Sequence, residues 1–188
     1  MPERATTRRN ALRGVVFVIP GALTRADPEP AQRDTPAAGR YRLMRADGAD
    51  ELLRRCYGRY RIAAISTLPH MSAADAWQSL AGLDWHRYFE TISSTTDLGT
   101  DSSRLGLYRT AATSLGIQPS GLAVVCENDA DTLAAIHAAG CHPVAVAAPV
   151  RGSARANARA AQQKPAANTP CALDLSAVVA ALESISAS

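Results

Sequence analysis

The chain has 188 residues, of which 47% are hydrophobic and 20% are charged, and its formal net charge is +3 at pH 7. A chain of this length is expected to fold as one domain whose core needs no disulfide or metal for stability. The four cysteines lack C-x-x-C spacing, the apolar runs are too short to span a membrane, and the net charge is too small to indicate nucleic-acid binding unless basic residues cluster.

The first thirteen residues are polar and rich in arginine, so we expect a flexible tail over residues 1–13 rather than a signal peptide. We therefore also expect a cytoplasmic protein.

The apolar run Val15–Ile19 follows this tail and ends at Pro20-Gly21. An apolar run without alternation is typical of a central strand in a parallel sheet that is covered on both faces. Ligands bind beyond the carboxyl ends of such strands, so the turn after Ile19 is predicted to border a functional site.

The residues of this turn resemble the first motif of the haloacid dehalogenase (HAD) superfamily, whose members are mostly phosphatases. That motif places Asp-x-Asp-Gly-Thr/Val-Leu after a hydrophobic strand, and this chain reads Val18-Ile-Pro-Gly-Ala-Leu-Thr24. Gly21, Leu23 and Thr24 match the motif. The resemblance implies that Val18 replaces the nucleophile and Pro20 replaces the general acid/base.

The segment from Arg25 to Gly39 is rich in proline, alanine and charge, and we expect an extended loop there. The HAD resemblance implies a capless or short-capped protein, because a full cap domain needs more residues. A helix is predicted over residues 48–60, with Asp47 able to cap it. A second buried strand is predicted over residues 60–69.

This second strand closes in Ser66-Thr67 and resembles the second HAD motif, in which a hydroxyl and nearby N–H groups hold a phosphate. Ser66 falls on the motif position, and Thr67 replaces the common asparagine. The alternative is that both hydroxyls cap the next helix. That helix is predicted over residues 72–80, with Trp77 and Leu80 on its buried side.

The segment from Gly99 to Tyr108 resembles the third HAD motif in its spacing. Ser102 stands at the position of the family's lysine, which offsets the charge of the nucleophile and phosphate. A hydroxyl cannot supply that charge. Arg104 follows two residues later and is able to reach the site, although an exposed arginine at a helix start is the simpler interpretation.

A third apolar strand, Gly121–Cys126, leads into an acidic segment that resembles the fourth motif, whose acidic pair holds magnesium. That pair aligns with Glu127 and Asn128, and Asp129 and Asp131 lie near. Acidic residues are also common in the first turn of a helix, where they favour its dipole. A helix is predicted over residues 132–139 and a last strand up to Val146.

We therefore expect a three-layer Rossmann-like (HAD-like) α/β domain with a central, mostly parallel sheet over residues 14–148. Residues 149–170 contain bases but no acids and are low in complexity, so we expect a linker that is disordered or partly helical. Residues 171–188 are expected to form a C-terminal helix that packs on the domain.

A phosphoaspartyl mechanism needs a carboxylate nucleophile, a general acid/base and a metal. With Val18, Pro20 and Ser102 at the central positions, we expect a catalytically inactive protein that acts as a binding or regulatory module. The candidate ligand-binding residues are Gly21, Ser66, Thr67, Arg104, Glu127, Asn128 and Asp131.

Two alternatives remain open. The first is a hydrolase with relocated chemistry, in which Asp27, Glu127 and Asp131 serve as carboxylates and Ser66 and Arg104 hold an anion. The second is an unrelated doubly wound nucleotide-binding domain, against which the absence of G-x-G-x-x-G and Walker-type loops counts. We expect no cofactor, because the ligands for the Mg²⁺ that the family uses are largely lost. A protein partner or a small phosphorylated ligand is expected, with no nucleic acid and no membrane, and a homodimer is compatible with the sequence.

Overall fold

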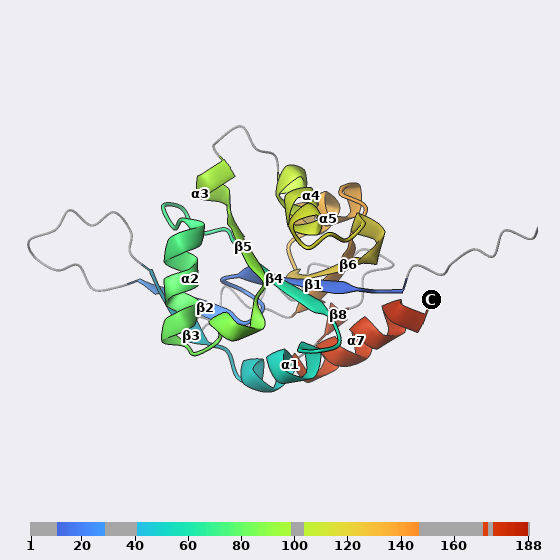
Figure 1. Cartoon of the computed structure of the whole chain (residues 1–188), viewed down its shortest axis with the longest axis horizontal. Helices are drawn as coiled ribbons and strands as arrows, with labels where there is room; N and C mark the ends of the chain where they lie inside the picture. Colours follow the sequence, from blue (N-terminus) through green and yellow to red (C-terminus); the bar gives the residue numbers. More distant parts are fainter. Residues whose placement is uncertain (1–10, 29–40, 99–103, 147–170, 173–174, 188) are drawn as a thin grey trace, which may run out of the picture.

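The centre of the molecule is a six-stranded sheet in the order β5-β4-β1-β6-β7-β8, and every neighbouring pair of strands is parallel (Figure 1). The computed structural model describes residues 11–28, 41–98, 104–146, 171–172 and 175–187. The six strands are β1 (Gly14–Ile19), β4 (Arg61–Ser66), β5 (Thr91–Ser94), β6 (Leu122–Glu127), β7 (His142–Val146) and β8 (Cys171–Ala172). All of β1 is buried, because it has a strand on each side and helices on both faces.

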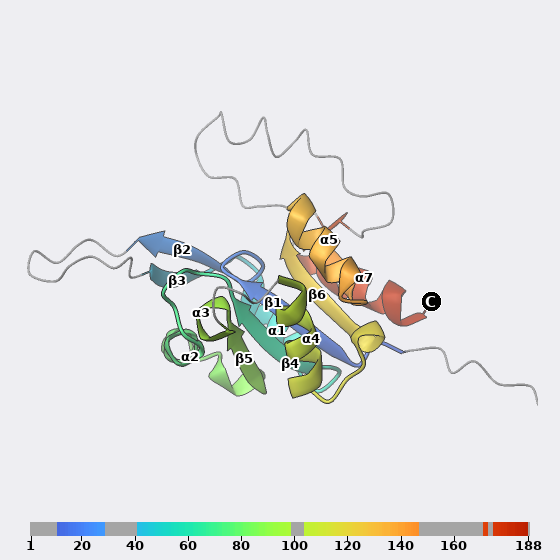
Figure 2. The same ribbon diagram turned by 90° about the horizontal axis from the view of Figure 1, so that it is seen from above.

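Helices cover both faces of this sheet (Figures 1 and 2). One face is covered by α1 (Ala49–Cys56) and α7 (Leu175–Ala187), which also contact each other. The opposite face is covered by α4 (Arg104–Ser114) and α5 (Ala130–Ala138). Each face has its own apolar core, with Phe17 in one and Val16 in the other. The expected three-layer α/β architecture is confirmed.

A two-stranded antiparallel hairpin follows the turn after β1. It consists of β2 (Thr24–Pro28) and β3 (Tyr41–Arg45), with Thr24 opposite Arg45. The expectation of an extended loop from Arg25 onward is therefore wrong for residues 25–28, because β3 supplies backbone hydrogen bonds that a strand needs and the sequence does not reveal. Residues 29–40 lie outside the described residues.

The helix after β4, α2 (Ala73–Gly82), begins with a capping box. Ser72 accepts a hydrogen bond from the backbone N–H of Asp75, and the Asp75 carboxylate accepts one from the backbone N–H of Ser72. The predicted burial is correct for Leu80 but wrong for Trp77, which is 38% exposed. Ala76, one turn before Leu80, occupies the buried face in its place.

Helix α1 also begins differently from the prediction. Its N-cap residue is Gly48, at φ 82°, and no side chain caps the helix, so Asp47 does not have the predicted role.

The short elements of the fold are η1 (His86–Tyr88), α3 (Thr95–Leu98) and η2 (Pro119–Gly121). Gly116, at φ 61°, follows the end of α4 in the left-handed region, where glycine commonly ends a helix.

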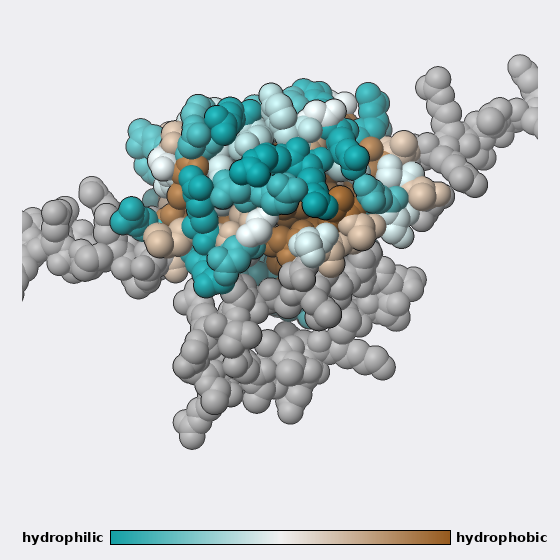
Figure 3. Space-filling view, turned by 90° about the horizontal axis from the view of Figure 1, so that it is seen from below, coloured by the Kyte–Doolittle hydropathy of each residue, from teal (hydrophilic) through white to brown (hydrophobic). Residues whose placement is uncertain are grey.

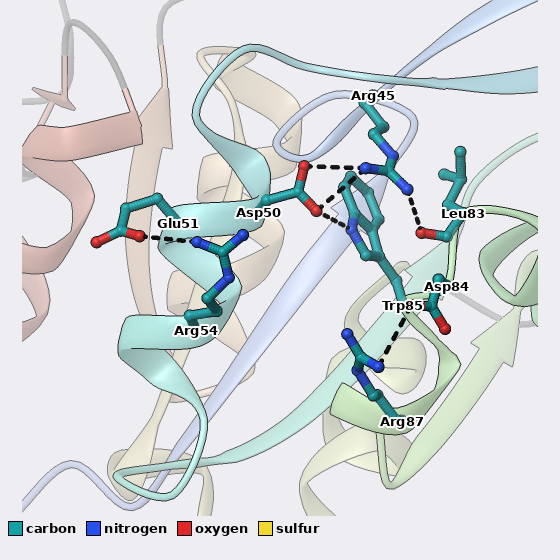
Figure 4. Close-up of polar contacts among 8 residues, drawn as sticks. All are labelled: Arg45, Asp50, Glu51, Arg54, Leu83, Asp84, Trp85 and Arg87. Atoms are coloured by element: carbon teal, nitrogen blue, oxygen red, sulfur yellow. Dashed lines mark hydrogen bonds and ion pairs between the residues drawn. The ribbon is translucent and has the colours of Figure 1, made fainter.

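A polar network joins the base of the hairpin to α1 and to the segment before η1 (Figure 4). The Asp50 carboxylate accepts hydrogen bonds from Nε1 of Trp85 at 2.7 Å and from Nη1 of Arg45 at 3.2 Å. The Nη2 atom of Arg45 donates to the backbone oxygen of Leu83 at 2.6 Å. The carboxylate of Asp50 therefore fixes the end of the hairpin and the start of α1 to the segment around Trp85, which is distant from both in sequence.

The face formed by α1 and α7 is hydrophilic over most of its described area, with hydrophobic residues gathered toward its middle (Figure 3). Val178 and Leu182 of α7 point inward and are fully buried.

The predicted linker over residues 149–170 lies outside the described residues. Among the described helices, none combines the length and hydropathy that crossing a bilayer requires.

Candidate functional site

A cleft of about 410 Å³ lies at the carboxyl ends of β1, β4 and β6, where the parallel topology predicts a ligand site. We call it the carboxyl-end cleft. The strand ends supply Val18, Pro20, Thr67, Cys126 and Glu127. The adjoining helices supply Thr95, Arg104, Leu107, Tyr108, Asp129 and Thr132.

The end of β1 contributes apolar surface to this cleft. Val18 is 6% exposed and packs with the core beneath α4 and α5, while Pro20 is half-buried. Gly21 follows at φ 139°, and a Cβ built on it would lie 3.0 Å from Cγ of Glu127. A side chain at position 21 would be strained and would also press on Glu127. The glycine therefore allows the turn after β1 to approach the end of β6 closely.

A polar chain crosses the rim of the cleft between α4 and α5. Nη1 of Arg104 donates to Oγ1 of Thr132 at 3.0 Å and lies 3.5 Å from Oδ2 of Asp129. That oxygen also accepts hydrogen bonds from Oγ1 of Thr132 at 2.6 Å and from its backbone N–H at 2.9 Å. The Thr132 contacts, led by its hydroxyl, lower the pKa of Asp129. Asp129 is therefore an ionised N-cap of α5 that also holds Arg104.

The two hydroxyl residues at the end of β4 lie in different environments. Thr67 is exposed and lines the cleft, and its backbone N–H donates to the oxygen of Ile19 at 3.0 Å. Ser66 is fully buried opposite Ile19 in the sheet, and its Oγ has no hydrogen-bond partner among the described residues. The geometry thus favours Thr67 over Ser66 for contact with a ligand. Neither residue caps α2, because Ser72 does so.

The remaining predicted site residues do not join the cleft. Asn128 is half-buried and Asp131 is exposed, and both lie outside the described residues that line it. Asp27 belongs to β2, and its side chain is not described. Ser102 falls in the gap at 99–103. Of the carboxylates considered for relocated chemistry, the cleft therefore contains Glu127.

The thiol and the phenol in the wall of the cleft are unsuited to nucleophilic attack at neutral pH. Burial raises the pKa of the Cys126 thiol to about 12, so it remains protonated. Burial likewise raises the pKa of Tyr108. Among the described residues that line the cleft there is no histidine to act as a general base.

The residues present do not fit a magnesium ion. Mg²⁺ requires near-octahedral oxygen ligands, and in proteins these are carboxylates together with water and substrate phosphate. The end of β1 offers Val18 and Pro20, and Oδ2 of Asp129 is already engaged by Thr132 and Arg104. Within the described part of the chain, no group of three or more metal-ligating side chains forms a possible metal site.

Sequence reasoning missed two hydroxyl residues of the cleft. Thr132 was detectable, because Asp129-x-x-Thr132 has the spacing of an N-cap side chain and the N3 residue. Thr95 lies at the start of α3, directly after β5, and carried no such signal. Together with Thr67, these two residues make three threonines among the described residues that line the cleft.

Neither a family model nor a curated protein matches the sequence. Solved structures do match. An uncharacterized protein from Listeria monocytogenes serotype 4b aligns with a TM-score of 0.72 at 15% identity, covering 94% of this chain and 100% of that one. A HAD-superfamily hydrolase of subfamily IA from Geobacter sulfurreducens aligns with a TM-score of 0.63 at 16% identity, covering 91% and 100%.

A third similar structure is a HAD family hydrolase from Deinococcus radiodurans with bound phosphate and sodium. Its TM-score is 0.63 at 18% identity, and the alignment covers 94% of this chain and 97% of that one. At identities this low, the similarities establish the fold and leave activity to be argued from the site.

Proposed function

We propose that this chain, which has the fold of the HAD-superfamily hydrolases, is catalytically inactive and acts as a binding or regulatory module. The observation that supports this proposal is the apolar end of β1, where Val18 and Pro20 line the cleft. The family's mechanism needs a nucleophilic carboxylate and a carboxyl acid/base at these two positions. A valine cannot attack phosphorus, and a proline cannot transfer a proton.

The ligand-binding part of the proposal concerns the polar wall of the same cleft. Thr67, Thr95 and Thr132 offer hydroxyl groups, and Arg104 offers a guanidinium group. Glu127 and Asp129 add two negative charges against that single positive charge. The balance disfavours a doubly charged phosphate unless Arg104 leaves Asp129. The inactive cleft is therefore better suited to a protein segment or a weakly charged, hydroxyl-bearing ligand.

The test is a phosphatase assay with p-nitrophenyl phosphate on wild type, Val18→Ala and Glu127→Ala, each purified free of contaminating phosphatase. We expect no turnover by any of the three proteins. Wild-type turnover that survives Val18→Ala and disappears in Glu127→Ala would favour relocated chemistry and contradict the proposal.

Restoring the family residues tests whether the fold still supports the reaction. Val18→Asp with Pro20→Asp is expected to recover little activity, because Ser102 leaves the phosphate charge without a partner. Adding Ser102→Lys is expected to help by more than its separate effect, since catalytic groups act as a unit. Circular dichroism on each variant separates absence of activity from loss of folding.

Magnesium binding gives an independent measurement. Calorimetric titration of the wild type with millimolar Mg²⁺ is expected to show no saturable heat, because β1 supplies no ligand. A saturable signal that vanishes in Glu127→Ala would show that a metal site has survived.

A further inference from the structure

A second hollow lies at the opposite end of the sheet, where β1 and β4 begin. We call it the amino-end groove, and its volume of about 650 Å³ lies in the range of about 300–1,000 Å³ that is usual for ligand sites. Its described lining contains four arginines and one glutamate, an excess of three positive charges: Arg13, Arg59, Arg61 and Arg87 against Glu90. The arginines come from positions 13 to 87, so the sequence does not show that they cluster.

Aromatic rings line the same groove as these arginines. Tyr57 is 59% exposed, and its ring meets that of Tyr88 edge to face, with centroids 5.4 Å apart at an interplanar angle of 81°. The guanidinium carbon of Arg87 lies 5.2 Å from the centroid of the Tyr88 ring. An exposed ring such as Tyr57 offers a planar apolar surface on which another planar group can stack.

The arginines differ in how firmly they are engaged. Arg61 is held by Glu90, with Nε 2.8 Å from the carboxylate, and by the backbone oxygen of Leu115. Arg59 pairs with Glu183 at 2.9 Å, but both side chains are more than half exposed, and exposed pairs are weak. Arg87 similarly pairs with Asp84 on the surface at 3.3 Å.

Arg13 is the least engaged of the four, since it makes no ion pair within the described residues. Its backbone is nevertheless fixed, because its N–H donates to Gly121 at 2.8 Å and its oxygen accepts from Arg61 at 3.0 Å. Three guanidinium groups, those of Arg13, Arg59 and Arg87, can therefore turn toward an anion.

We propose that the amino-end groove binds single-stranded nucleic acid, with phosphates on these three arginines and a base stacked on Tyr57. The forked guanidinium group matches a phosphate, and base stacking on aromatic rings is how proteins hold unpaired strands. An acidic protein segment would use the charge but not the exposed ring. The proposal departs from the expectation of no nucleic-acid partner, because the groove gathers the basic residues whose clustering the net charge alone did not indicate.

The groove lies away from the carboxyl-end cleft, so the inference stands whether or not the cleft is catalytic.

The test measures the fluorescence anisotropy of a labelled single strand of about twelve nucleotides, a length common for such sites, titrated with the full chain. Tyr57→Leu is expected to weaken binding by about 5- to 150-fold, the range found when a stacking ring is removed. Tyr57→Phe keeps the ring and should bind like wild type. The matched control is Trp77→Leu, which removes an exposed aromatic ring from α2 and should change nothing.

Salt dependence tests the phosphate contacts. Arg13→Gln is expected to reduce the slope of log K against log salt by about 0.7, the value for one phosphate on a single strand. Arg109→Gln is the control, because it removes the same charge from an exposed site on α4. Arg104→Gln in the cleft should likewise leave binding unchanged.

Three results would overturn the proposal. The first is no binding at about 50 mM salt, where such electrostatic contacts are strongest. The second is equal weakening by the control variants. The third is displacement by a polyglutamate peptide together with an unchanged affinity of Tyr57→Leu, which would identify a surface for acidic proteins instead. A melting curve of each variant tests whether that variant is folded.

Discussion

Asp129 has two roles at the start of α5. Its carboxylate caps the helix through the backbone N–H of Thr132 and holds Arg104 across the rim of the cleft. We expect Asp129→Ala to lower the free energy of unfolding by about 1 kcal/mol, the usual effect of losing an N-cap side chain. Asp131→Ala, an exposed change in the same helical turn, should cost less. Urea unfolding at pH 7 measures both.

The same contacts predict a pH dependence. The hydrogen bonds from Thr132 hold the pKa of Asp129 below its ordinary value of 3.8, so the folded protein binds this proton less readily than the unfolded chain. The stabilisation is therefore complete above about pH 5 and is lost as the pH falls through the lowered pKa. The difference in stability between wild type and Asp129→Ala should shrink below pH 3.8. A difference that stays constant down to acid pH would contradict this assignment.

At the scale of the residue, the sequence predicted part of the cleft. Val18, Pro20, Thr67 and Glu127 all follow or end apolar strands, and parallel pairing brings such positions to one edge. The sequence could not predict which of Ser66 and Thr67 faces the cleft, because a fully apolar strand has no alternation of polar and apolar residues to show which side chains face the site.

At the scale of the element, Asp50 joins three segments through Arg45 and Trp85. We expect Asp50→Ala to destabilise the fold by about 1–3 kcal/mol, because it leaves the N–H of the buried Trp85 without its partner. Glu51→Ala is the control, since within the described part of the chain Glu51 makes only exposed ion pairs with its own helix. Thermal unfolding followed by tryptophan fluorescence reports the change, and equal losses in both variants would show that the network contributes nothing.

The strands of the central sheet were easier to predict than the hairpin. β1, β4 and β6 are apolar runs, and burial on both faces requires such runs. β2 reads Thr-Arg-Ala-Asp-Pro, which carries no strand signal, and it forms because β3 pairs with it. Trp77 was predicted to lie on the buried side of α2 with Leu80, but Ala76 is the residue buried there beside Leu80. Tertiary contacts therefore determine both the formation of β2 and the buried face of α2.

At the scale of the whole molecule, the last helix completes the core on one face of the sheet. Leu182 of α7 is fully buried in the same core as Leu53 of α1, although the two are distant in sequence. Leu182→Ala is expected to cost about 2–5 kcal/mol, the range for a truncated buried leucine. Glu183→Gln, at the exposed neighbouring position, should cost far less. If chemical denaturation finds the two variants equally stable, α7 does not contribute to the core.

The burial of Val18 also bears on how phosphoaspartyl chemistry could be introduced into this fold. Val18 is 6% exposed and packs in the core beneath α4 and α5. An aspartate there, with neither a metal nor the family's lysine to balance it, would cost about 3–5 kcal/mol, a large share of the roughly 5–15 kcal/mol that keeps a domain folded. A lone Val18→Asp change would therefore destabilise the fold without supplying a working active site. The change would need compensating substitutions, such as a lysine at position 102, to be made first, so the order of the substitutions matters.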